Sequence, residues 1–238
     1  HGQGEWMVSA RYMRMAMENN SAGTTDLSDM DIIKLPNPYQ MGNMSTTLSV
    51  VPQNMTMGMV MLGVMYAPID TITLMGMGML TDKNMTLNTY RGTMPMSDMG
   101  EMSGEMHRAN LGSFNTSTFD LSDLSLSGLV KLYEGNVSRV HAQIGIQQSV
   151  GANNSMGEVL TPMNMRNAMI LPYGMQSGDG STSIISALTY VATVGGRAYG
   201  GQVRSQNALA TNLWSFGDSL SLTGWIQQEL TEKTALSF

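Results

Sequence analysis

The sequence predicts an all-β protein, and more specifically an antiparallel up-and-down transmembrane β-barrel of the outer-membrane type. Side-chain character alternates with period 2 along most of the 238 residues, whereas helical periodicity is hard to find over any long window. Tight turns alternate with long polar connections. Charged residues make up only 13% of the chain, against about a quarter in soluble domains. Outer-membrane barrels combine short periplasmic turns, long external loops and an uncharged lipid-facing side.

Nine strand-like segments follow one another along the chain, and about 11 residues each would cover an apolar band of ~25 Å when tilted. They are predicted at residues 5–17, 54–67, 71–82, 120–133, 136–149, 182–193, 197–208, 217–229 and from Thr234 onward. Gly, Pro or charged residues suit tight reversals, which we expect at 68–70, 134–135, 194–196 and 230–233. The other connections are mostly long: 18–53, 83–119, 150–181 and the shorter 209–216.

Residues 1–238 are predicted to form one barrel domain. The predicted strands number nine, whereas bacterial single-chain barrels close with an even number of strands. We therefore expect further strands beyond Phe238; the alternative is a miscounted strand, with Phe238 as the terminal aromatic residue of the barrel. Five aromatic residues next to the tight turns predict a girdle at the membrane interface: Trp6, Tyr66, Tyr133, Tyr190 and Tyr199.

Composition excludes several classes of protein. The net charge is −6 and no stripe of Lys or Arg is present, so we expect no nucleic-acid partner. The chain has no cysteine, which removes disulfides and thiolate metal sites. No apolar run reaches the roughly 20 residues of a membrane-spanning helix.

Three segments carry a resemblance to a known family: HGQGEWMVSARYMRMAMENNSAGT (1–24), NMTMGMVMLGVMYAPIDTITLM (54–75) and MILPYGMQSGDGS (169–181). They resemble bacterial outer-membrane proteins classed as transporters and related to the meta-pathway phenol-degradation-like barrels, and the similarity runs through nearly the whole chain. The resemblance implies an outer-membrane barrel, a role in transport, and a sequence that continues beyond Phe238. The segment 91–119 departs from the family by extra Met and Ser residues, so loop-borne properties do not carry over.

Methionine is the compositional anomaly, with 26 residues. In segment 54–67 we expect Val60, Leu62 and Val64 to face lipid, which leaves the odd-numbered methionines inside. Soft thioethers select Cu(I), but methionine also fills irregular interiors and offers a path to apolar solutes. The candidate metal-binding lumen wall comprises Met55, Met57, Met59, Met61, Met75, Met77 and Met79, and it is extended by Met65 and by Met7, Met13, Met15 and Met17.

A second candidate metal site lies in the connection 83–119. Methionines clustered with one histidine in an outward-facing loop are suited to capture Cu(I) or Ag(I), and such a loop is equally suited to grip a partner protein. Its residues are Met94, Met96, Met99, Met102, Met106 and His107.

Polar residues of two other strands predict a hydrophilic part of the interior. His141, Arg139 and Gln143 would lie opposite Asp123, Ser125, Ser127 and Lys131. A Ser-His-Asp hydrolase would draw on the same residue types, but no nucleophile motif surrounds the serines. We expect polar lining and no enzymatic activity.

These observations predict a passive transporter of small solutes in the bacterial outer membrane, with a methionine-lined interior and Cu(I) as a candidate cargo. Its partners would be lipid and a small solute or soft metal ion. One alternative is a structural or docking barrel whose long loops bind another surface component. The other is a soluble β-sandwich binding module, in which the methionine face would be a packed core.

Overall fold

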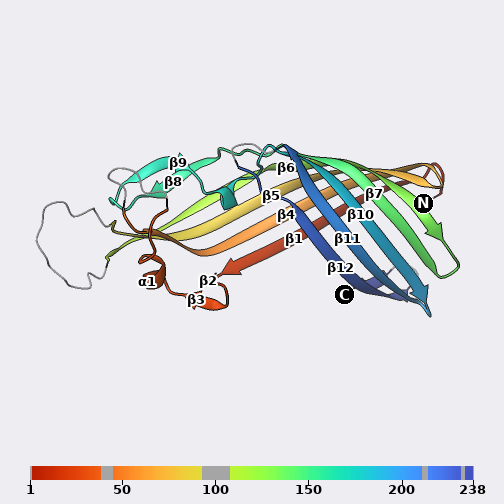
Figure 1. Cartoon of the computed structure of the whole chain (residues 1–238), viewed down its shortest axis with the longest axis horizontal. Helices are drawn as coiled ribbons and strands as arrows, with labels where there is room; N and C mark the ends of the chain where they lie inside the picture. Colours follow the sequence, from red (N-terminus) through yellow and green to blue (C-terminus); the bar gives the residue numbers. More distant parts are fainter. Residues whose placement is uncertain (1, 39–44, 93–107, 211–213, 232–233, 238) are drawn as a thin grey trace, which may run out of the picture.

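The computed structural model describes residues 2–38, 45–92, 108–210, 214–231 and 234–237. In them, nine strands form a single antiparallel sheet in the order β1-β4-β5-β6-β7-β10-β11-β12-β13, curled into a half-barrel (Figure 1). The strands are β1 (Trp6–Glu18), β4 (Val50–Ile69), β5 (Ile72–Tyr90), β6 (Asn110–Glu134), β7 (Ser138–Ser149), β10 (Thr182–Val194), β11 (Arg197–Ala210), β12 (Ser219–Thr231) and β13 (Thr234–Ser237). The prediction of an all-β, up-and-down antiparallel architecture is confirmed. One curled sheet does not fit the β-sandwich alternative, which needs two facing sheets.

Three strands are much longer than the predicted 11 residues: β4, β5 and β6 have 20, 19 and 25 residues. The prediction of a long loop at 83–119 is therefore wrong at both of its ends. The β5–β6 pairing continues from Ile72↔Val130 to Tyr90↔Asn110. A paired hairpin satisfies its own backbone hydrogen bonds, so it can extend beyond the apolar part of the sheet into water.

The long connections also contain small elements, which gather at one end of the half-barrel, opposite the N-terminus (Figure 1). The hairpin β2 (Asn20–Ala22) and β3 (Thr25–Leu27) leads into α1 (Asp29–Ile32), and the hairpin β8 (Met156–Leu160) and β9 (Arg166–Ile170) precedes the short 3-10 helix η1 (Tyr173–Met175). Two apolar clusters pack α1 and β8 onto the sheet: Ile32, Ile33, Val51 and Tyr90 in one, and Leu87, Phe114 and Leu160 in the other. Among the residues so described, no helix is long and apolar enough to cross a membrane.

Asp29 fastens α1 to the outer ends of β4 and β5. Its carboxylate accepts hydrogen bonds from the Gln53 amide at 2.9 Å, the Tyr90 hydroxyl at 2.7 Å and the Asn88 amide at 3.2 Å. Burial raises the pKa of this carboxyl, but the three hydrogen bonds outweigh it, and the pKa lies below its ordinary value. These hydrogen bonds hold α1 against the end of the sheet.

The convex face of the half-barrel is apolar. Leu62 is 51% exposed and Leu126 is 68% exposed, and the strand register places them with other exposed hydrophobic side chains that point away from the hollow. These side chains are Trp6, Val8, Tyr12, Val60, Leu62, Val64, Leu74, Leu124, Leu126, Val130, Ile144, Ile146, Ile184, Leu188, Tyr190, Val203, Leu220, Leu222 and Ile226. A patch that runs over eight strands far exceeds what a soluble monomer exposes.

The apolar face has defined limits along the strands. At the tight-turn end the rings of Trp6 and Tyr66 stack at a centroid distance of 4.4 Å. At the other end Arg14 and Asp82 flank Gly58 in one row of the sheet. The stretch from Trp6 to Arg14 measures about 27 Å along the strand at ~3.4 Å per residue, comparable with the ~25 Å apolar band of transmembrane barrels before strand tilt shortens it.

Candidate functional site: the concave face

Methionines cover the concave side of β1, β4 and β5, on the face predicted to point inward. Met59 and Met75 are buried at 9% and 8% exposure, whereas Val60 and Leu74 beside them on the convex face are at 36% and 47%. Edge strand β1 leaves its methionines more exposed. The predicted division of the two faces is confirmed, and Met85, in the part of β5 taken for a loop, continues the same wall.

The strand register sets the methionines side by side across neighbouring strands. Rows of three are Met7, Met65 and Met75, and Met17, Met55 and Met85; rows of two are Met13 and Met59, Met15 and Met57, and Met61 and Met79. Directly opposed residues have Cα atoms 4.5–5.5 Å apart in an antiparallel pair. Flexible thioethers in one row are therefore within reach of each other. Met77 has no methionine beside it, because its neighbours in the row are Gly63 and Ser125.

Polar residues line the other side of the hollow. Lys131 faces His141 across β6 and β7, and Leu129 faces Gln143, whose amide donates a 2.9 Å hydrogen bond to Ser127 Oγ. Arg139 and Ser125 complete the predicted set, paired with Glu134 and Gln147. The predicted shared face is present.

The strand register keeps the residues of the hydrolase alternative apart. Asp123 lies in the row of Ser149 and His141 lies in the row of Lys131. Asp123 and Lys131 are about 27 Å apart along β6 at ~3.4 Å per residue. The geometry therefore does not form a Ser-His-Asp triad.

The second predicted metal set lies outside the described residues. Met94, Met96, Met99, Met102, Met106 and His107 all fall within 93–107. Among the residues that are described, no cluster of three or more His, Asp or Glu side chains is suited to hold a metal ion.

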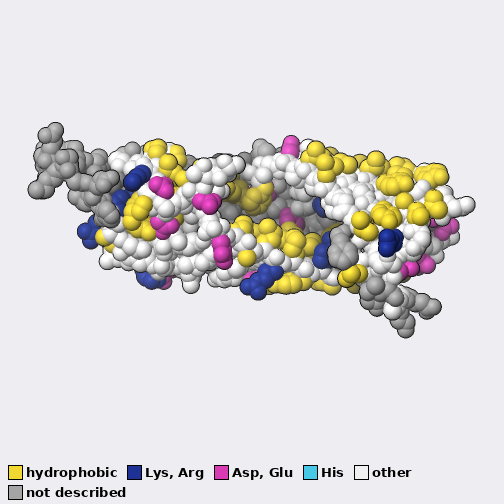
Figure 2. All heavy atoms as spheres, turned by 90° about the horizontal axis from the view of Figure 1, so that it is seen from below, with side chains coloured by type: hydrophobic (Ala, Val, Ile, Leu, Met, Phe, Trp, Pro, Cys, Tyr) yellow, Lys and Arg dark blue, Asp and Glu magenta, His cyan; other side chains and the backbone are white. Residues whose placement is uncertain are grey.

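A segment that the sequence pattern did not predict to lie inside folds into the hollow. Residues 171–181, taken for part of an outward loop, include Met175 at 0% and Gln176 at 2% exposure. Figure 2 shows the hollow from its open side, with hydrophobic side chains along its wall and acidic groups inside. The signal that the sequence offers is the glycine at 178, where an added Cβ would lie 2.6 Å from the Gly151 carbonyl oxygen.

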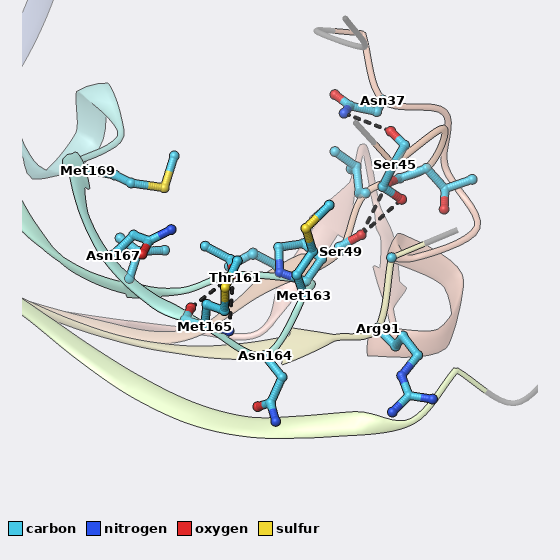
Figure 3. A pocket seen from close by; sticks show the side chains of 16 residues that line it. Asn37, Ser45, Ser49, Arg91, Thr161, Met163, Asn164, Met165, Asn167 and Met169 are labelled. Atoms are coloured by element: carbon cyan, nitrogen blue, oxygen red, sulfur yellow. Dashed lines mark hydrogen bonds between the residues drawn. The ribbon is translucent and has the colours of Figure 1, made fainter. Parts of the chain in front are cut away.

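A pocket of about 860 Å³ opens at the capped end of the half-barrel (Figure 3). Met163, Met165 and Met169, from hairpin β8–β9 and its turn, form one side, and Asn37, Ser45 and Ser49 lie across from Met169. Arg108 stiffens that second side by donating to Leu48 O at 2.7 Å and to Thr47 Oγ1 at 2.8 Å. These three methionines lie in the predicted connection 150–181, and no strand periodicity there indicated a site.

Comparison with known proteins adds no identification. No family model matches the chain, and no curated protein matches it. The class that the fold itself defines is an antiparallel β-sheet curled into a half-barrel, apolar on its convex face and lined by methionine and polar groups on its concave face.

Proposed function

We propose that the protein is a barrel of the bacterial outer membrane that lets small solutes pass along its methionine-lined interior without catalysis. The observation that carries the proposal is the inverted distribution of side chains. Large hydrophobic residues such as Leu62 are exposed on the convex face, while Thr81, Lys83 and Ser127 are buried on the concave face. Lipid outside and a partly polar interior account for this distribution.

The aromatic residues and the family resemblance support the same proposal. Trp6, Tyr66, Tyr133, Tyr190 and Tyr199 all lie on the convex face beside the tight turns, where an interfacial girdle belongs. The sequence segments at 1–24, 54–75 and 169–181 resemble outer-membrane transporters. In a bilayer the edges of β1 and β13 must also find partners, because hydrocarbon does not satisfy backbone donors and acceptors.

Ion flux tests the proposal. Purified protein added to planar lipid bilayers in potassium chloride should produce discrete conductance steps, and heat-denatured protein should produce none. The folded protein should require detergent for extraction and should migrate faster before heating than after it. Extraction without detergent, or a bilayer that stays silent at all protein concentrations, would contradict the transport function.

Copper is the second candidate cargo, supported by the rows of paired methionines. Thioethers bind Cu(I) without deprotonation, and Met-to-Leu exchanges in a packed interior cost less than about 1.5 kcal/mol. Leu at the five β4 methionines Met55, Met57, Met59, Met61 and Met65 breaks every row, and it should therefore keep the fold and abolish Cu(I) uptake in competition with bicinchoninate.

The matched variant carries Leu at Met94, Met96, Met99 and Met102, in the other predicted metal set. Comparing the two variants shows whether Cu(I) binds the methionines of the concave face or those within 93–107. If both variants still take up copper, neither methionine set binds it, and the methionines of the concave face serve only to pack the interior.

The docking alternative predicts a different result. A barrel whose capped end only binds another surface component would insert in membranes and show heat-modifiable migration without conducting ions. The bilayer measurement therefore separates the two functions.

A further inference from the structure

The segment 171–181 (LPYGMQSGDGS) lies inside the half-barrel rather than beyond its end. Met175, Gln176 and Asp179 are at 0%, 2% and 3% exposure. Loops ordinarily run over protein surfaces, because buried backbone groups need partners. A segment buried in this way needs hydrogen-bond partners for its backbone groups from the surrounding strands.

The wall of the hollow supplies those partners at the η1 end. Lys83 Nζ donates to Gly174 O at 3.0 Å and to Gln176 O at 2.6 Å. Thr118 Oγ1 donates to Met175 O at 2.9 Å. Lys83 is itself buried at 6% exposure, so its charge is committed to these carbonyl groups.

The other end of the segment is held just as closely. The Asp179 N–H donates to Ser149 Oγ at 3.1 Å, and the Asp179 carboxylate accepts from the Phe216 N–H at 2.9 Å. A Cβ added to Gly178 would lie 2.6 Å from the Gly151 carbonyl oxygen. Glycine is therefore required where the segment meets the chain after β7.

A small polar cavity remains beside the segment. Its volume is about 160 Å³, room for about five waters at ~30 Å³ each. Asp123 and Asp179 line it, and the positive charge of nearby Lys83 interacts with the Asp123 carboxylate. The other lining residues are Gln147, Ser149, Ser181, Ser183, Gln206, Phe216 and Gly217.

We propose that residues 171–181 form the constriction of the barrel, with Lys83 as the positioning residue, and that the cavity beside Asp123 makes the passage favour small cations over anions. This inference rests on the transport function. Carboxylates in a confined polar space attract cations and repel anions. The segment occupies space that an open barrel would leave to water.

Ion selectivity and conductance test the constriction in planar bilayers. With a potassium chloride gradient, the reversal potential of the wild type should show preference for potassium. Asp123→Asn should lower the potassium-to-chloride permeability ratio by about threefold or more. Lys83→Met removes the opposing charge and both hydrogen bonds, so it should raise that ratio and also enlarge the conductance at least twofold.

Arg166→Met is the control, since it removes an exposed cation from the hairpin β8–β9, outside the strands that line the hollow, where Arg166 pairs with Glu158 at 2.9 Å. It should not enlarge the conductance. Conductance and selectivity that stay unchanged in both Asp123→Asn and Lys83→Met would overturn the constriction while leaving transport intact. A protein that conducts in no form would overturn the transport function itself.

Discussion

Leu62→Arg is expected to reduce the folded, membrane-inserted fraction of the protein sharply. Leu62 lies on the convex face midway between the Tyr66 row and the Gly58 row, which is the centre of the apolar band. An arginine at the midplane of a transmembrane barrel costs about 2–4 kcal/mol, a large share of the 5–15 kcal/mol that stabilises typical proteins. Guanidinium unfolding in lipid vesicles, followed by heat-modifiable migration, measures this loss.

Thr56→Arg provides the comparison on the same strand and the same face. Thr56 lies beyond the row of Arg14, Gly58 and Asp82, outside the apolar band. Near the interface an arginine costs about 0–1 kcal/mol. Equal losses in the two variants would show that the convex face does not contact hydrocarbon.

Gly145→Val is expected to weaken the β6–β7 pairing severely. A Cβ on Gly145 would clash with Ser127 Cβ and would lie 2.6 Å from the Leu126 carbonyl oxygen. Neither atom is the end of a flexible side chain, so the strands themselves would have to move. Overpacking of this kind costs about 1–3 kcal/mol or more.

The control for this effect is Gly76→Val in β5, where an added Cβ meets nothing within 4 Å. The same guanidinium titration should show little change in stability for Gly76→Val. In a hydrogen-exchange measurement, the amide protons of β7 should exchange fast in Gly145→Val alone. Equal stability of the two variants would contradict the close approach of β6 and β7 at this position.

Strand positions were predictable because residues of the convex and the concave face alternate along the chain. Segment 182–193 matches β10 (Thr182–Val194) almost to the residue, since alternation ends at Gly195 and Gly196, both with positive φ, where glycine is favoured. The ends of β5 and β6 were not predictable by the same rule. Asp82 ends the apolar band of the convex face, but pairing between β5 and β6 continues past it.

The sequence predicted which residues lie on the concave face, but it did not predict which of them contact one another. Alternation alone assigns Met59 and Met75 to the interior, whereas the rows they join depend on strand register, which turns and bulges set. The inward segment depends on contacts between residues far apart in sequence, such as Lys83 with Gln176. Local sequence patterns carry no signal for such a contact.

We expect the convex face to contact lipid and the methionine face to lie away from it. Because the chain has no cysteine, single cysteines at positions 59 to 64 can each carry a nitroxide spin label in the membrane-inserted protein. Collision rates with oxygen, which concentrates in hydrocarbon, should peak at Val60, Leu62 and Val64 and fall at Met59 and Met61. Oxygen collision rates that peak at the methionine positions, or that do not alternate along β4, would contradict the account.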